Sequence, residues 1–321
     1  MDSSSRTRAM VEGALMACLT AVLALIGIYL PFLAVLTSLV FTIPIIIVTI
    51  RRGVLTGVLS ILTAGLLVFA LYEPLRGFML LLQYGGLSVF YGYAFAKELN
   101  AAFTLGIGAV IGAISLLLTF YVGFIVTGIS DLAMFEQMKA SVGPSIEMLK
   151  QLGYFNNSGV NEEAFRQFII SAIDNALILI PAVFVLYGMM VAIINHIISQ
   201  KVLRKMGIHV QPLPPFTEWR LPWWTIYGFI LGYGFNLLGN FLGNDLWIKI
   251  GYNISSIYGI IFLVLGLSLV LFLQKKFLPG RMYRTLIFIF LVFFYPLISW
   301  VMMIIGIVDL LFNYRSRIRG N

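Results

Sequence analysis

The chain contains 321 residues, of which 60% are hydrophobic and 11% are charged, and its formal net charge is +8. Soluble domains carry about 25% charged residues, so this composition excludes a water-soluble globular protein and indicates one that is embedded in lipid. The lysines and arginines lie in short loops between apolar runs, which favours membrane topology and contact with anionic lipid over nucleic-acid binding.

Long apolar runs predict membrane helices, because about 20 apolar residues span the hydrocarbon core as an α-helix. The runs are continuous rather than alternating, which excludes a transmembrane β-barrel. We therefore expect an all-α polytopic membrane protein with about eight to ten membrane helices. In chain order, the predicted spans cover residues 9–28, 31–50, 54–71, 78–96, 101–128, 168–198, 222–242 and 252–273, followed by an apolar stretch at 285–312.

Residues 129–168 differ from the spans because they hold five acidic and three basic side chains. Apolar residues recur there at helical spacing, which predicts one or two amphipathic helices on the outer membrane surface, broken at Gly143–Pro144. Asn161, followed by two glutamates, predicts a helix start with an amide N-cap. Pro181 predicts a kink in the span that follows.

A basic, proline-containing connector at residues 201–221 divides the sequence into two membrane units. The first unit, residues 1–200, contains six predicted spans. The second, residues 222–321, contains two spans and the final apolar stretch, which Pro296 interrupts. That stretch therefore predicts either one long kinked span or a hairpin of two half-helices.

The distribution of basic residues predicts the orientation of the chain. With the N-terminus inside, the inner loops carry 13 lysines and arginines and the outer loops carry five. The positive-inside rule therefore predicts a multi-pass protein of the cytoplasmic membrane with its N-terminus inside. Arg315, Arg317 and Arg319 follow the last apolar stretch, and only an even number of crossings would place them inside, which favours the hairpin.

Several features recur together in the first 200 residues. Residues 14–23 read Ala-Leu-Met-Ala-Cys-Leu-Thr-Ala-Val-Leu, Pro31 opens the second predicted helix, and Pro44 precedes Arg51-Arg52-Gly53. These features resemble the substrate-binding (S) subunits of energy-coupling-factor vitamin transporters. The resemblance implies a six-helix bundle with a ligand site near the outer face, which docks on a transmembrane coupling subunit that works with ATPases.

The end of the chain carries a second resemblance. Residues 306–309 read Gly-Ile-Val-Asp and residues 313–315 read Asn-Tyr-Arg. Together with the spans that follow the six-helix unit, this ending is similar to the YybS-like family of Firmicute membrane proteins.

Three small residues on the first helix are candidates for helix docking. Gly13, Ala17 and Ala21 lie four residues apart on one face, where another helix can approach closely. Ala17 and Ala21 also match the Ala-x-x-x-Ala pattern with which S subunits dock on the coupling subunit. The alternative is that this face packs against other helices of the same chain.

Polar residues near the predicted outer face are candidates for ligand binding. Asp174 and Asn175 are the first pair, because ionisable groups in a span usually face the protein interior or a cavity. Asp174 could instead lie hydrated at the headgroup level or pair with Arg166. Glu73 and Arg76 could bind a polar ligand or pair with each other.

Gln83 and Tyr84 carry the amide and phenol groups that suit a neutral heterocyclic ligand. The alternative is that the tyrosine anchors its helix at the membrane interface.

Other polar residues predict structural roles. We expect His196 at the inner membrane interface and Asp309 in an ion pair with Arg315 or Arg317. Glu12 could contact a partner protein or Arg8.

Motifs for catalysis are absent from the sequence. It contains no P-loop, nucleophile elbow or zinc-protease motif, and the single cysteine, Cys18, excludes an internal disulfide. We therefore expect no enzyme activity and no cofactor or metal. The leading hypothesis is a component that binds or transports a small molecule, in the manner of an S subunit. The alternative is a non-transporting scaffold or regulatory partner protein.

Overall fold

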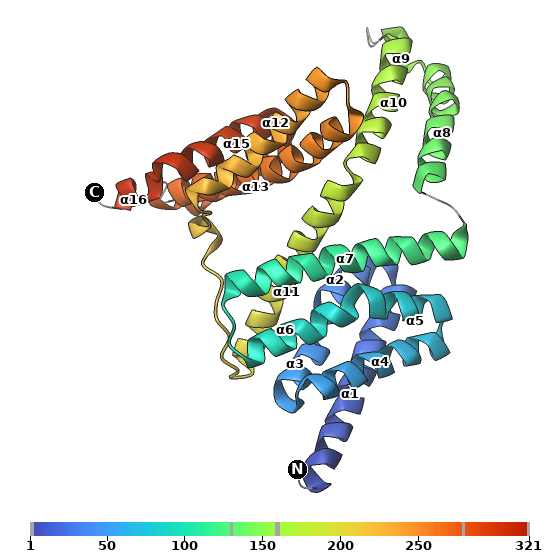
Figure 1. Ribbon diagram of the computed structural model, residues 1–321, viewed down its shortest axis with the longest axis vertical. Helices are drawn as coiled ribbons and strands as arrows, with labels where there is room; N and C mark the ends of the chain where they lie inside the picture. The colour runs from blue at the N-terminus through green and yellow to red at the C-terminus, as the bar shows by residue number, and fades with distance from the viewer. Residues whose placement is uncertain (1–2, 129–130, 158–160, 278–279, 320–321) are drawn as a thin grey trace. The chain divides into compact units, whose positions relative to one another are not determined.

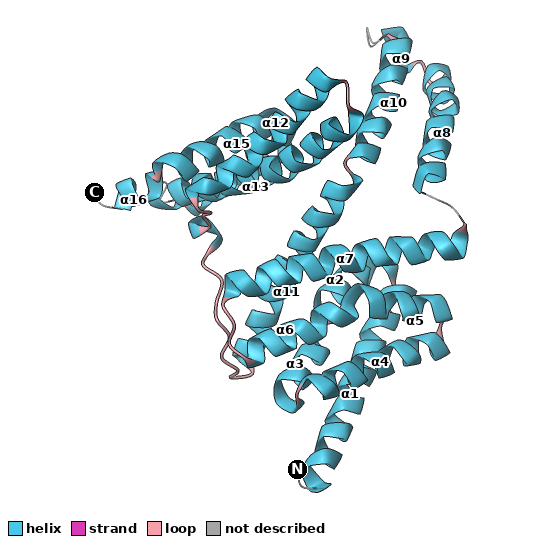
Figure 2. Ribbon diagram, viewed as in Figure 1, coloured by secondary structure: helices cyan, strands magenta, loops and turns pink. Residues whose placement is uncertain are grey.

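The computed structural model describes residues 3–128, 131–157, 161–277 and 280–319 (Figure 1). The described residues form helices, turns and loops, and contain no strand (Figure 2). Within these described ranges, six helices are long and apolar enough to cross a membrane: Arg6–Tyr29, Val54–Leu71, Pro74–Ala96, Ala101–Thr127, Ile180–Lys205 and Asp245–Phe277. The protein is therefore an all-α polytopic membrane protein, as the sequence predicts.

The chain folds as two compact units. The first comprises Met1–Ile173 and Val183–Leu213, and the second comprises Asp174–Ala182 and Pro214–Asn321. The division falls inside the predicted connector, at Leu213 and Pro214. Residues 174–182, which precede the connector in the chain, pack with the second unit.

The first unit is built from helices α1 to α11. Their bounds are α1 Ser3–Tyr29, the 3-10 turn Pro31–Leu33, α2 Ala34–Val40, α3 Ile43–Arg52, α4 Val54–Leu71, α5 Pro74–Leu80, the π-helical turn Leu81–Gly85, α6 Gly86–Ala96, α7 Ala101–Thr127, α8 Asp131–Gln151, α9 Tyr154–Asn157, α10 Glu162–Ile178 and α11 Ile180–Lys205.

Helix α3 lies at the centre of this unit, where residues 43–49 are all buried. Two apolar clusters pack around it, one containing Ile46, Leu87 and Tyr91 and the other containing Ile45 and Val68. Because α3 is enclosed by protein, it needs only ten residues and not the length of a lipid-exposed span.

The predicted span 31–50 is therefore wrong as one continuous helix, because the structure divides it into a 3-10 turn, α2 and α3. Pro44 has no N–H to donate to the carbonyl of Val40, where α2 ends. The hydroxyl of Thr37 binds the carbonyls of Leu33 and Ala34, within α2 and the turn before it.

The surface segment and the helix start after it also differ in part from expectation. Helix α8 continues through Pro144, so the predicted break there is wrong. Pro144 removes one backbone hydrogen bond, and the helix forms on both sides of it. The predicted N-cap is confirmed, because Asn161 Oδ1 accepts hydrogen bonds from the backbone N–H groups of Glu163 and Ala164 at 2.9 and 3.2 Å.

The second unit is built around three helices, α12, α13 and α15, which lie side by side in Figure 1. Their bounds, with the shorter elements of this unit, are the 3-10 turns Phe216–Glu218 and Trp223–Thr225, α12 Ile226–Leu242, α13 Asp245–Phe277, α14 Arg281–Phe293, α15 Tyr295–Phe312 and α16 Tyr314–Arg319.

Helices α13 and α15 run parallel. Gly259 faces Met303, and three residues further along Gly306 lies against the carbonyl of Phe262. The chain changes direction by 108° between α14 and α15, at the break before Pro296. Since α13 and α15 run in the same direction, their C-terminal ends lie at the same end of the bundle. This arrangement is the one expected for the hairpin, and it places the start of the basic tail beside the C-terminus of α13.

Candidate functional site

A cluster of amide and phenol groups lies at the π-helical turn between α5 and α6. The turn contains Gln83 and Tyr84, both half-buried. Gln83 Nε2 donates a hydrogen bond of 2.9 Å to the hydroxyl of Tyr187, which comes from α11. The ring of Tyr84 packs edge-on against Phe41 with centroids 4.6 Å apart, and its hydroxyl interacts with that of Tyr187.

Close backbone packing positions Tyr187. A Cβ on the next residue, Gly188, would lie 2.2 Å from the carbonyl oxygen of Ala109, and one on Gly112 would lie 3.0 Å from the Cα of Gly188. Glycine at both positions allows α7 and α11 to touch. One helical turn further, the hydroxyl of Tyr91 donates to the carbonyl of Ala192 at 2.7 Å, which fixes α6 against α11.

The π-helical turn gives this site its geometry. Such turns carry an extra residue and occur frequently at functional sites. Here the turn directs Gln83 and Tyr84 to α11, while Leu81 and Gly85 line a groove on another side. The cluster offers one amide and two hydroxyls in an otherwise apolar setting, which can hydrogen-bond a neutral polar molecule.

That groove has a volume of about 570 Å³ and is open on one side. It is lined by α4, the π-helical turn and α6, through Val54, Val58, Ile61, Leu62, Leu81, Gly85, Gly86, Val89, Phe90 and Tyr93. Its lining is almost entirely apolar, so it suits a hydrocarbon group.

The remaining predicted ligand residues are Glu73, Arg76, Asp174 and Asn175. Glu73 and Arg76 approach each other to 3.9 Å and are both well exposed, so they form the ion pair that the sequence left open as an alternative. Asp174 is half-buried and Asn175 is exposed. Both lie in α10 within the stretch that packs with the second unit.

The small-residue face of α1 packs inside the first unit. Ala17 and Ala21 are 0% and 2% exposed and contact Ile61 and Ala64 of α4 in one apolar cluster. A Cβ on Gly13 would lie 3.0 Å from Ser60 Oγ, also on α4. The face is thus covered by the chain's own helix, which is the alternative to docking on a coupling subunit.

Two polar side chains of the first unit, Glu12 and His196, have partners that the sequence did not predict. The carboxylate of Glu12 lies 3.1 Å from Arg51 Nη1 and 2.6 Å from Arg52 Nε, so it pairs with these two arginines. His196 is 1% exposed and packs edge-on against the rings of Tyr91 and Phe95, so it is buried within the protein.

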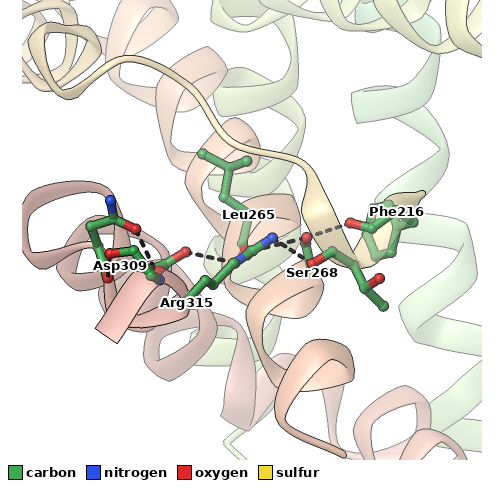
Figure 3. A network of polar contacts seen from close by, with 8 residues as sticks. Phe216, Leu265, Ser268, Asp309 and Arg315 are labelled. Atoms are coloured by element: carbon green, nitrogen blue, oxygen red, sulfur yellow. Dashed lines mark hydrogen bonds and ion pairs between the residues drawn. The ribbon is translucent and has the colours of Figure 1, made fainter. Parts of the chain in front are cut away.

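Sequence reasoning missed the polar network of the second unit, although it anticipated one of its pairs. Arg315 Nε lies 3.0 Å from Asp309 Oδ2, and both side chains are under 5% exposed. The guanidinium also donates to the carbonyl of Thr217 at 2.6 Å and to Ser268 Oγ at 3.1 Å. Figure 3 shows Arg315 between Asp309 and Ser268, whose hydroxyl donates to the carbonyl of Phe216.

A second polar side chain that sequence reasoning missed joins α13 to residues 178–182, in the stretch between α10 and α11 that packs with the second unit. Asn253 Nδ2 donates to the carbonyl of Ile178, and its Oδ1 accepts from the N–H of Ala182, each at 2.8 Å. In an unbroken α-helix these two backbone groups would bond each other. Asn253 therefore bridges the break near Pro181 that the sequence predicts. A polar residue inside an apolar span was the available signal.

The chain matches a family of known membrane proteins. The model of the family described as "Predicted membrane protein (DUF2232)" matches residues 18–310. The protein named "Uncharacterized protein YybS" of Bacillus subtilis (strain 168) is 24% identical over 317 residues, which cover 98% of this chain and 99% of that protein. No solved structure matches the chain.

Proposed function

This protein belongs to the DUF2232 family of predicted membrane proteins, and from that premise we propose that it is a non-enzymatic membrane component that binds a small neutral molecule at the π-helical turn. The observation that carries the proposal is the hydrogen bond between Gln83 and Tyr187, two residues 104 positions apart in the chain. A ligand with a ring and polar edges would exchange this bond for its own contacts with the amide and hydroxyls. Tyr84 and Phe41 supply aromatic surface beside it.

The test is a thermal-stability screen of the detergent-purified protein with vitamins and other neutral heterocyclic metabolites. A ligand at 100 times its Kd stabilises the folded state by about 2.7 kcal/mol. Gln83→Leu and Tyr187→Phe are expected to abolish the shift. Gln137→Leu and Tyr121→Phe make the same changes at exposed positions outside the cluster and are expected to keep it.

A screen in which no compound stabilises the protein, together with no co-purifying metabolite, would contradict the proposal. So would a stabilising compound whose effect survives both cluster substitutions.

The packing of α1 favours a second candidate, a non-transporting scaffold or regulatory protein. The face that would dock on a coupling subunit is occupied by α4. Photo-crosslinkers at Ala17 and at Leu19, which is exposed on α1, separate the two candidates. Capture of an ATPase-linked coupling subunit supports transport, and crosslinks from Ala17 to α4 alone support the scaffold.

A further inference from the structure

The open groove on the first unit has two chemically different ends. Helix α4 runs antiparallel to α6 and the π-helical turn, because Gly57 and Gly92 both contact Thr49, whereas Gly65 contacts Leu81. The end of the groove formed by Val54 and Tyr93 therefore lies at the N-terminus of α4. The other end, at Leu62 and Leu81, lies further along α4 and is apolar.

Two basic residues lie close in sequence to the N-terminal end of the groove. Arg51 and Arg52 end α3 and are separated from Val54 by Gly53, and the carboxylate of Glu12 contacts them both. Two guanidinium groups thus share one carboxylate, which leaves one net positive charge. The arginine side chains remain 44% and 33% exposed, so they can still contact a group that arrives from outside.

The backbone at this end adds to the attraction. Gly53 is the N-cap of α4 and provides no side-chain cap, so the first N–H groups of this 18-residue helix have no side-chain acceptor at the cap. A Cβ at Gly53 would meet nothing within 4 Å, so the approach is open. A helix N-terminus next to arginines favours an anion such as phosphate.

From the apolar groove and its cationic end together, we infer that the first unit binds one anionic phospholipid, with an acyl chain in the groove and the phosphate at Arg51 and the N-terminus of α4. The volume of the groove lies within the range of about 300–1,000 Å³ that is typical of ligand sites. An apolar helix of a partner protein would fill the groove without using the charge, whereas an anionic lipid uses both. This site is separate from the Gln83–Tyr187 cluster.

The inference also agrees with the predicted orientation. Arg51 and Arg52 lie on an inner loop in the positive-inside assignment, and anionic lipids attract basic residues at that surface by about 1 kcal/mol for each lysine or arginine. The lipid would therefore come from the inner leaflet.

The experiment measures binding of phosphatidylglycerol and phosphatidylcholine to the full-length protein by native mass spectrometry from mixed micelles. The wild type is expected to retain one phosphatidylglycerol in preference to phosphatidylcholine. Val58→Trp fills the groove and is expected to abolish retention of phosphatidylglycerol. Leu62→Trp is expected to have the same effect, and it replaces the first variant if Val58→Trp fails to fold. Leu66→Trp places the same side chain on an exposed part of α4 outside the groove and is expected to behave as wild type.

Charge is tested separately from shape. Arg51→Gln keeps the Arg52–Glu12 ion pair and is expected to lower the affinity for phosphatidylglycerol by about fivefold, without affecting phosphatidylcholine. Arg76→Gln removes an exposed arginine in the first turn of α5 and is the matched control. Equal retention of the two lipids, retention by both tryptophan variants, or displacement of lipid by a second copy of the chain would overturn the inference.

Discussion

Arg315 and Asp309 form an ion pair that is almost fully removed from solvent, with 3.0 Å between Nε and Oδ2. Asn313, whose φ of +51° is in the left-handed region, separates α15 from α16 and turns Arg315 back toward the bundle. Arg315 also bonds carbonyl and hydroxyl oxygens from the connector and from α13. Three segments of the second unit thus meet at one guanidinium.

We expect Arg315→Met to destabilise the second unit by about 3–5 kcal/mol, because it leaves the Asp309 carboxylate buried without a cation. Thermal unfolding in detergent measures the effect. Arg317→Met, at an exposed position of the same tail, is the control and should change little. The double substitution Asp309→Leu and Arg315→Met should recover part of the loss, and a double variant weaker than Arg315→Met would argue against this account.

Asn253 is expected to control local opening at the break between α10 and α11. Asn253→Ala removes the acceptor of the Ala182 N–H and the donor to the Ile178 carbonyl. An unpaired buried group costs about 1–3 kcal/mol, so hydrogen exchange at Ala182 should accelerate. Asn240→Ala is the matched control, because the amide of Asn240 bonds only to Asn236 within α12 among its described contacts. Unchanged exchange in Asn253→Ala would show that the bridge is dispensable.

Close backbone contact between α13 and α15 predicts sensitivity to a single methyl group. A Cβ on Gly266 would lie 1.8 Å from the carbonyl oxygen of Met302, which is backbone and cannot move aside alone. Gly266→Ala should therefore destabilise the unit by about 1–3 kcal/mol. Gly234→Ala in α12 meets nothing within 4 Å and should be neutral or stabilising by up to about 1 kcal/mol. Thermal unfolding of the two variants in detergent measures the difference, and equal stability of Gly266→Ala and Gly234→Ala would contradict the prediction.

The parallel arrangement of α13 and α15 predicts which side of the membrane the tail occupies. In a Cys18→Ser background, Lys275→Cys and Ser316→Cys should react with an impermeant maleimide from the same side. Asn244→Cys, in the turn between the antiparallel helices α12 and α13, should react from the opposite side. Reaction of Ser316→Cys together with Asn244→Cys would instead make 285–312 a single crossing.

Composition and periodicity predicted the helical membrane fold because lipid imposes one simple rule on every exposed span. Where protein replaced lipid as the surroundings, the prediction was less accurate. Residues 43–49 read as part of a span, yet α3 is enclosed by neighbouring helices and is short. Apolar sequence alone does not distinguish these two environments.

Polar contacts between distant residues were the hardest to predict. Gln83 and Tyr84 stood out in the sequence, but their partner Tyr187 did not, because nothing local links residues 104 positions apart. Asp309 could be paired with a nearby arginine from spacing alone. The contribution of Ser268 and of the Thr217 carbonyl depends on how the helices pack, which the sequence does not state.

The π-helical turn at Leu81–Gly85 also fixes the angular phase between α5 and α6. Each residue advances an α-helix by about 100°, so an extra residue in regular α geometry would rotate one side of the helix against the other by roughly that amount, and the π-helical turn takes up the extra residue instead. Deleting one residue here would remove the turn that directs Gln83 and Tyr84 to α11. The length of this turn, as much as the identity of its side chains, determines which groups face the interior.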